Sequence, residues 1–244
     1  MRIAYSVFTP LCNFLFPLRC AGCNALLALD SDARICPACA ASIQPPQAPL
    51  CLRCGIPLLA PGETCERCRR EPPLFGKARA LTCYRAHPGA SPDILGSLLR
   101  RHKYGGNQAL AASLTQLLRR GLPLEERYDL VVPVPLHPRR LRWRGFNQSA
   151  IFAAAVARKL GCRLDTSALV RVIPTRPQTA QDLASRRRNV HNAFAVRYPQ
   201  AVCNARVLLV DDVLTTGATI NECARVLNAS GAREVDVLTI ARAL

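Results

Sequence analysis

Two adjacent carboxylates and a short hydroxyl-rich loop are the residues of this sequence best suited to chemistry. The apolar run Val207–Val210 is typical of a buried strand, and it leads directly into Asp211 and Asp212. A short loop of Thr215, Thr216, Gly217, Ala218 and Thr219 then leads into a helix that is predicted over 219–229. Because open α/β sheets bind ligands at the carboxyl ends of their strands, we expect a binding site here.

The loop and the carboxylates suit two parts of one ligand. Consecutive backbone N–H groups at a helix start bind anions, Gly217 allows close approach, and the threonine hydroxyls add donors. Ionised carboxylates only accept hydrogen bonds, so Asp211 and Asp212 suit the vicinal hydroxyls of a sugar. The pattern therefore predicts a ribose 5-phosphate site. The alternative is a strand end whose acids and threonines only cap the next helix, although a cap needs one such residue.

Eight of the 13 cysteines form four C-x-x-C pairs in the N-terminal third of the chain. Each pair places two thiolates on one side of a tight turn, and two such turns complete a tetrahedral shell for zinc. The gaps 24–35 and 55–64 are short and similar, as in consecutive zinc ribbons. We expect about two structural Zn²⁺ ions, one on Cys20, Cys23, Cys36 and Cys39 and one on Cys51, Cys54, Cys65 and Cys68. Interleaved pairing and a redox role for a C-x-x-C pair are the alternatives.

Composition and charge limit the class of protein. Half of the 244 residues are apolar, which is enough for a folded core. The net charge of +17 favours polyanions such as nucleic acid, a phosphorylated small molecule or an anionic membrane face. Genome-driven use of Arg is the alternative explanation. The apolar N-terminus is interrupted by Pro10 and Pro17 and is too short to span a bilayer, so we expect a cytoplasmic protein without a transmembrane segment.

The elements that must position these residues alternate between strands and helices. Strands are expected over 79–85, 129–135, 207–213 and 234–240, and helices over 94–102, 109–119, 146–160 and 219–229. This alternation predicts an α/β fold with an open, mainly parallel sheet and flanking helices. The composition changes near residue 75, so we expect an N-terminal arm and double zinc-ribbon module over 1–75 and the sheet domain over 76–244.

Two further sets of residues carry simpler expectations. The polar stretch 171–193 has no clear core face and predicts a lid or mobile loop. The remaining five cysteines lie mostly among apolar neighbours, which is typical of buried free thiols, and they are Cys12, Cys83, Cys162, Cys203 and Cys223.

Several segments make the chain resemble known proteins. The run VLLVDDVLTTGAT resembles the phosphoribosyl-pyrophosphate (PRPP) motif of type I phosphoribosyltransferases. The segments LVVPVPLHPRR, RGFNQS and SRRRN, with the cysteine pairs ahead of them, resemble the competence protein F (ComF) family over nearly the whole chain. The resemblance implies a type I phosphoribosyltransferase-like fold behind a double zinc ribbon.

The resemblance also implies roles for individual residues. Asp211 and Asp212 become the catalytic pair, which holds the ribose as positive charge develops, with Mg²⁺ on the pyrophosphate oxygens. The loop over 135–137 faces the pyrophosphate, which makes His137 a PRPP-binding residue, and His137 and Arg139 are candidates to receive the leaving group. The stretch 171–190 becomes a flexible hood. A structural role is the alternative for a lone histidine near prolines.

Two functions remain open from the sequence. The ComF resemblance implies a role in DNA uptake during natural transformation, with the site binding PRPP or a related ligand while basic residues hold single-stranded DNA. The candidate basic residues are Arg67, Arg69, Arg70, Arg186, Arg187 and Arg188. An aromatic content of 5% favours contacts with phosphates over an extended base-stacking surface. The alternative is a Mg²⁺-dependent phosphoribosyltransferase with an unknown acceptor and a purely structural zinc module.

Overall fold

The structure is a computed structural model, and it describes residues 17–28, 35–84, 122–124, 126–174 and 190–244. The chain forms two compact units, Met1–Ile43 with Gly89–Arg120, and Gln44–Pro88 with Gly121–Leu244. Several sequence-based expectations concern residues outside the described ranges: the two helices over 94–102 and 109–119, the basic residues Arg186–Arg188, and Cys12. The proposed boundary at residue 75 stays a prediction.

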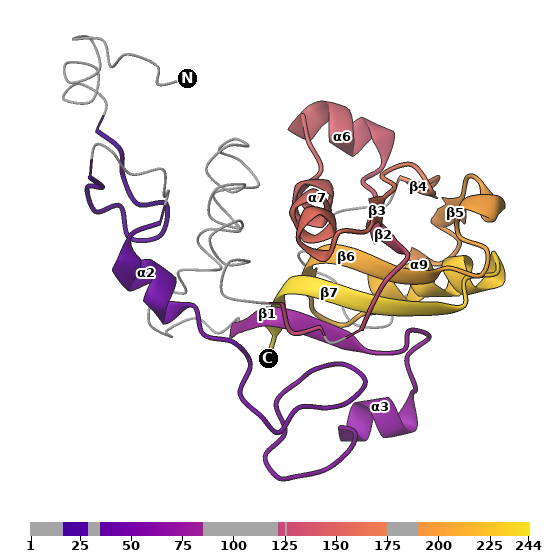
Figure 1. The fold of residues 1–244 in the computed structure, drawn as a ribbon, viewed down its shortest axis with the longest axis horizontal. Coiled ribbons are helices and arrows are strands. Elements are labelled where there is room, and N and C mark those ends of the chain that lie inside the picture. Colours follow the sequence, from indigo (N-terminus) through magenta and orange to yellow (C-terminus); the bar gives the residue numbers. More distant parts are fainter. Residues whose placement is uncertain (1–16, 29–34, 85–121, 125, 175–189) are drawn as a thin grey trace. The chain divides into compact units, whose positions relative to one another are not determined.

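A five-stranded parallel sheet is the frame of the second unit (Figure 1). All four pairs of neighbouring strands run parallel. In spatial order the strands are β1 (Ala78–Tyr84), β7 (Glu234–Ala243), β6 (Arg206–Leu214), β2 (Leu130–Pro133) and β3 (Arg163–Leu164). The apolar run Val207–Val210 is fully buried because β6 is a central strand, and such strands are covered on both faces. The predicted α/β fold with a mainly parallel sheet is confirmed.

The two long helices of this unit connect strands of the sheet. Helix α7 (Gln148–Leu160) leads from β2 to β3, and α9 (Ala218–Ala229) leads from β6 to β7. The two connections leave the neighbouring strands β6 and β2 in opposite directions along the sheet. Because such crossovers are right-handed, the two helices cover opposite faces. The carboxyl ends of β6 and β2 therefore form a topological switch point, where open α/β sheets bind ligands.

Some elements differ from the sequence-based expectation. The helix predicted over 146–160 is shorter, and a separate helix α6 (Pro138–Arg144) precedes it. Gly145 takes a left-handed φ of 81° and ends α6, which separates the two helices. A small antiparallel sheet of β4 (Leu169–Arg171) and β5 (Phe194–Val196) was not predicted.

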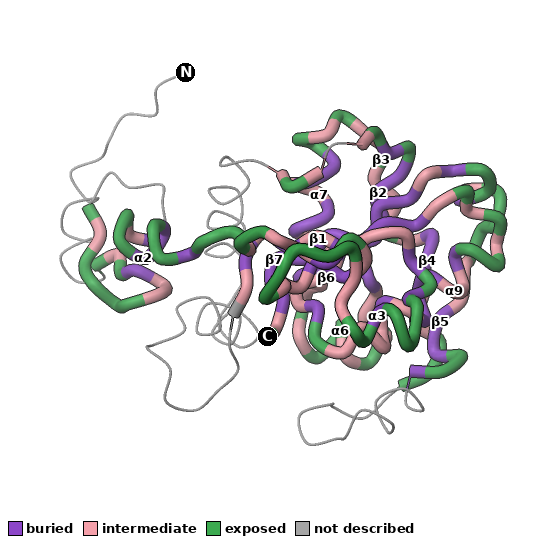
Figure 2. The backbone as a smooth tube through the Cα atoms, turned by 90° about the horizontal axis from the view of Figure 1, so that it is seen from below, coloured by how far each residue is buried: buried purple, intermediate pink, exposed green. Residues whose placement is uncertain are grey.

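The polar stretch over 171–193 was expected to have no core face, and its C-terminal end contradicts this. Val190 and Ala193 belong to the main buried core together with Phe194. Figure 2 shows buried backbone at β5, which follows this stretch. The residues 175–189 of this stretch lie outside the described residues. The expectation of buried free thiols holds for Cys223 but is wrong for Cys203, which is exposed.

A buried polar network closes the amino-terminal edge of the sheet. Asp236 on β7 is fully buried and accepts hydrogen bonds from the Tyr128 hydroxyl at 3.0 Å and the Lys77 backbone N–H at 2.9 Å. Arg206 forms an ion pair with Asp236 at 3.3 Å and lies over the Tyr128 ring. This network is at the end of the sheet opposite Asp211. Among the described residues, no helix combines the length and apolar character needed to cross a membrane.

Candidate functional site

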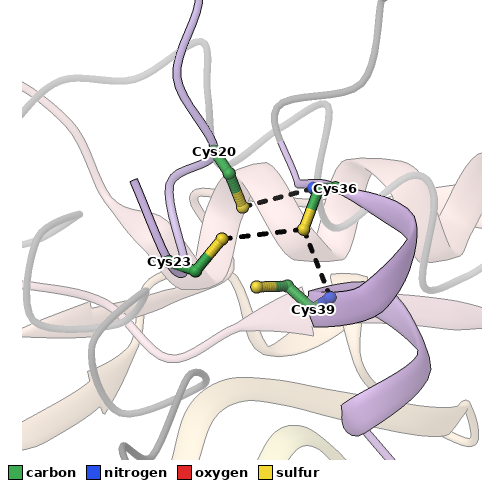
Figure 3. Close-up of side chains that lie close together, drawn as sticks. All are labelled: Cys20, Cys23, Cys36 and Cys39. Atoms are coloured by element: carbon green, nitrogen blue, oxygen red, sulfur yellow. Dashed lines mark hydrogen bonds between the residues drawn. The ribbon is translucent and has the colours of Figure 1, made fainter. Parts of the chain in front are cut away.

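The eight paired cysteines form two clusters of four sulfur atoms. In each cluster the Sγ atoms all lie within 4.8 Å of one another, Cys20, Cys23, Cys36 and Cys39 in one and Cys51, Cys54, Cys65 and Cys68 in the other. Figure 3 shows the first cluster, in which the four thiols converge on one point. The structure thus brings together the two sets expected from consecutive pairing.

The spacing of the sulfur atoms fits tetrahedral zinc. A Zn–S bond of about 2.3 Å requires sulfur atoms about 3.8 Å apart. Cys23 Sγ and Cys36 Sγ are 3.7 Å apart in the first cluster, and Cys54 Sγ and Cys65 Sγ are 3.8 Å apart in the second. The two four-cysteine sites support about two structural Zn²⁺ ions, each held by thiolates alone.

The two clusters repeat one backbone geometry. The Cys20 N–H donates to the carbonyl of Ala25 at 2.7 Å, and the Cys51 N–H donates to the carbonyl of Ile56 at 2.9 Å. The fourth residue after the first cysteine is left-handed in both, Asn24 with φ 65° and Gly55 with φ 66°. The second pair then caps a short helix in both, α2 (Pro37–Ser42) and α3 (Glu66–Arg70).

Backbone N–H groups favour the thiolate form of the first cysteine in each cluster, whereas burial raises the pKa of Cys39 in the first cluster and of Cys54 and Cys68 in the second. Burial raises the pKa of Cys20, but N–H groups of Cys36, Cys23 and Gly22 outweigh it and lower the pKa to about 6. Burial likewise raises the pKa of Cys51, and N–H groups, that of Cys54 foremost, lower it to about 7. Since zinc binds the thiolate, these donors prepare both sites for the metal.

The second cysteine cluster is joined to the sheet by many contacts. Arg53, between two of its ligands, donates to the carbonyls of Pro73 and Phe75 at 3.0 and 2.8 Å, and the Ala78 N–H donates to the Arg53 carbonyl at 2.6 Å. The Leu74 backbone is paired with side chains of α9, because its N–H donates to Asn221 and its carbonyl accepts from Asn228. The second ribbon is therefore an integral part of the unit that contains the sheet.

The predicted acid pair lies on β6 near its carboxyl end. Asp211 Oδ1 accepts hydrogen bonds from the Ser149 hydroxyl at 2.8 Å and from the Asp212 backbone N–H at 2.9 Å. Ser149 lies in the first turn of α7, where the Asn147 side chain caps the helix. Asn147 also donates to the carbonyl of Val134 at the exit of β2. The segment RGFNQS thus joins the two strand ends and orients the Asp211 carboxylate.

The predicted anion loop has the geometry expected of it. Gly217 takes a left-handed φ of 77° and is the N-cap of α9, whose first N–H groups therefore have no carbonyl partner within the helix. The Ala218 N–H is 3.4 Å from the Thr216 hydroxyl oxygen. Ala218 and Thr219 begin the helix, so their N–H groups lie at the positive end of its dipole. N–H groups in this arrangement are able to bind an anion.

Basic side chains lie on the β2 side of the acid pair. Burial and the charges of Arg139, Arg171 and Arg142 lower the pKa of His137. Burial also lowers the pKa of Arg171, and Asp211 acts against it. His137 itself caps α6, because its Nδ1 accepts from the Arg139 N–H at 3.2 Å. His137 thus has a visible structural role, at the edge of a group of cations that suits an anion.

A cavity of about 550 Å³ lies beside the anion loop. The cavity is lined by Cys65 and Arg67 of the second ribbon, by Phe75 between that ribbon and β1, by Thr216 of the loop and by Asn221 of α9. This volume is in the range of small-molecule sites. The predicted residues Thr215–Ala218 line this cavity, whereas Asp211, Asp212 and His137 do not.

Two domain families match the chain. Residues 147–244 match the phosphoribosyl transferase domain, and residues 11–69 match the double zinc ribbon domain. The DNA utilization protein YhgH of Salmonella typhi is 36% identical over 237 residues, which cover 93% of this chain and 98% of the relative. Competence protein F of Haemophilus influenzae is 29% identical over 238 residues, which cover 95% of this chain and 99% of the relative. The chain belongs to the competence protein F family.

The family assignment confirms the resemblance found in the sequence, including the double zinc ribbon ahead of the phosphoribosyltransferase-like domain. A solved structure of glutamine PRPP amidotransferase from B. subtilis aligns with a TM-score of 0.37 and 20% identity, over 64% of this chain and 29% of that protein. At this score the superposition supports no conclusion of its own.

The sequence reasoning missed three residues of the site. Ser149 orients Asp211, and its only signal was its place in the segment RGFNQS. Arg67 donates to the Thr216 carbonyl, and Arg242 donates from Nη1 to the carbonyls of Leu214 and Thr215 at 2.8 and 2.6 Å. Arg67 was expected only as part of a DNA-binding surface and Arg242 was not singled out, because each reaches the loop only through the tertiary fold.

Proposed function

We propose that this ComF-family protein binds PRPP or a related ribose 5-phosphate ligand and acts in DNA uptake by handling single-stranded DNA in the cytoplasm. The observation that carries the proposal is the adjacency of Asp211 and Asp212 to the loop 215–219 at the switch point of the sheet. Sugar acceptors and a phosphate cradle meet there on consecutive residues.

Each part of the site has a task in this proposal. The N–H groups of the loop bind the 5′-phosphate, helped by the hydroxyls of Thr215, Thr216 and Thr219. Asp211, held by Ser149, and Asp212 accept hydrogen bonds from the ribose hydroxyls. His137 and the neighbouring Arg171 would face the pyrophosphate, since the charge of Arg171 acts on His137. Mg²⁺ would bind with the pyrophosphate and neutralise part of its charge.

Helix α6 supports the DNA part of the proposal. None of its residues is buried, and it carries Arg139, Arg140, Arg142 and Arg144 without an acidic residue. Trp143, the one tryptophan of the chain, is 71% exposed on this helix. Arginines bind backbone phosphates, and an exposed indole stacks on a base whatever its identity. The names of the relatives, a DNA utilization protein and a competence protein, are consistent with such a partner.

Titration calorimetry with Mg²⁺ and PRPP tests the ligand part. We expect the D211N/D212N variant to bind much more weakly while its circular dichroism stays that of the wild type, since Asn still accepts the hydrogen bonds from Ser149 and Asp212 N–H. Ribose 5-phosphate is the matched ligand, because it lacks only the pyrophosphate. Equal affinity of wild type and variant for PRPP would place the site elsewhere.

The cavity beside the loop favours a second function, a phosphoribosyltransferase. Its 550 Å³ would accept a nucleophile of the size of a base or an amine beside the loop 215–218, although Asp211 and Asp212 do not line it. In that reaction the nucleophile forms a bond to the anomeric carbon and pyrophosphate leaves. Asp211 and Asp212 would stabilise the ribose as positive charge develops on it. Incubation of ribose-labelled PRPP and Mg²⁺ with the protein and cell extract gives a labelled product that is absent with the D211N/D212N variant if this function holds, and the same products with both proteins if the site only binds.

A further inference from the structure

Two arginines connect the second zinc ribbon to the backbone of the anion loop. Arg67 on α3 donates to the carbonyl of Thr216. Arg242 on β7 donates from Nη1 to the carbonyls of Leu214 at 2.8 Å and Thr215 at 2.6 Å. These three consecutive carbonyls directly precede Gly217, at which the N–H groups of the cradle begin. The position of the cradle is therefore tied to two guanidinium groups.

Arg242 is a buried cation that needs a counter-charge. It is 4% exposed, and among the described residues no carboxylate forms an ion pair with it and its Nε has no hydrogen-bond partner. Burial of an uncompensated charge is strongly unfavourable. Arg242 lines the same cavity as three of the four sulfur ligands of the second site, Cys54, Cys65 and Cys68. Four thiolates around Zn²⁺ leave about two negative charges, so the loaded second site supplies the missing counter-charge.

The loop also lacks dense packing on this side. Residues Leu214–Ala218 face the 550 Å³ cavity whose opposite wall is the second ribbon. An open cavity provides few dispersion contacts to hold a loop in place. Leu214 is fixed in the core as the last residue of β6, so the arginine contacts matter most for Thr215 and Thr216.

We propose that Arg67 and Arg242 are positioning residues through which zinc at Cys51, Cys54, Cys65 and Cys68 sets the conformation of the anion loop. This inference rests on the proposed binding of PRPP at that loop. Loss of zinc from the second site then weakens PRPP binding. Because binding linkage is reciprocal, PRPP strengthens zinc retention at the second site by the same factor.

The Arg67 contact is tested with two variants of one exposed helix. R67A removes the donor to Thr216, whereas R69A removes the same charge from α3, where Arg69 makes no side-chain contact with the loop. We expect R67A to weaken PRPP binding by about 3- to 10-fold, the net effect of one ordinary hydrogen bond, and R69A by less than about 2-fold. Both variants should keep the zinc content of the wild type.

The two roles of Arg242 are separated by a conservative and a neutral replacement. R242K keeps the buried charge but cannot reproduce the planar guanidinium contact with both carbonyls, so we expect normal zinc retention and about 10-fold weaker PRPP binding. R242M removes the charge as well, so we expect zinc retention to fall by about 10-fold or more in addition. Zinc retention is measured by competition with a chromogenic chelator in the full-length C36S protein, which leaves only the second site loaded.

The outcomes distinguish this inference from the proposed function. If the wild type does not bind PRPP, the proposed function fails, while the zinc retention of R242M against R242K still tests the charge coupling. The inference is overturned if R67A binds PRPP as R69A does and R242M retains zinc as R242K does. If R242M fails to fold, the comparison of R67A with R69A decides the question.

Discussion

Gly55 allows a sharp test of how the second ribbon is joined to the sheet. Its φ is +66°, and a Cβ atom added there would lie 2.5 Å from the carbonyl oxygen of Ala78. Ala78 is fully buried, paired with Val237 in the sheet and bonded to the Arg53 carbonyl, so it cannot give way. G55A should therefore cost about 1–2 kcal/mol for the left-handed backbone and about 1–3 kcal/mol for the clash.

The first ribbon supplies the matched control for this prediction. Asn24 occupies the equivalent position with φ 65°, and N24A should cost only the backbone part, about 1–2 kcal/mol. G55N isolates the clash, because asparagine tolerates the left-handed region but still carries a Cβ. Urea unfolding followed by far-ultraviolet circular dichroism measures the free energies. If the free energies of unfolding of G55A and G55N both lie within about 0.5 kcal/mol of the wild-type value, Gly55 does not approach Ala78 as closely as described.

Three further predictions follow from the zinc clusters, the buried network and the basic surface. C36S and C51S should each lose one of two zinc ions by elemental analysis, whereas loss of both from either variant would contradict independent clusters. D236N should destabilise the protein by about 2 kcal/mol in urea, because Arg206 loses its buried partner and keeps only the half-exposed Glu234. D129N, in an exposed pair with Arg233, should change stability by less than about 1 kcal/mol. Equal effects of the two variants would refute the assignment. Single-stranded DNA should bind with a slope of log K against log salt of roughly −0.7 per phosphate neutralised, and it should quench the fluorescence of Trp143. The D211N/D212N variant should bind the DNA with the same affinity. A slope near zero would rule out a phosphate-binding surface.

The long elements were predictable from the sequence because their signals are local. The Val- and Leu-rich runs predicted β6 and β7, and the alternation of strands and helices predicted the parallel sheet. The spacing of the cysteines predicted two four-sulfur clusters. The helix predicted over 219–229 begins one residue earlier, at Ala218, directly after the left-handed Gly217.

The contacts that complete the site were not predictable in the same way. Ser149 reaches Asp211 only because α7 starts at the neighbouring strand end, and Arg242 reaches the loop across 27 residues of sequence. The short strands β3, β4 and β5 carry too few residues for a periodic pattern. Such features depend on tertiary packing, which overrides weak local preferences.

The central claim is that residues 211–219 bind a phosphoribosyl group, and a crystal structure of the protein with Mg²⁺ and PRPP tests it most directly. We predict electron density for the 5′-phosphate at the N–H groups of Gly217, Ala218 and Thr219 and for the ribose hydroxyls at Asp211 and Asp212. Density for the ligand away from these residues, or an empty loop at a PRPP concentration that saturates binding in solution, would contradict the claim.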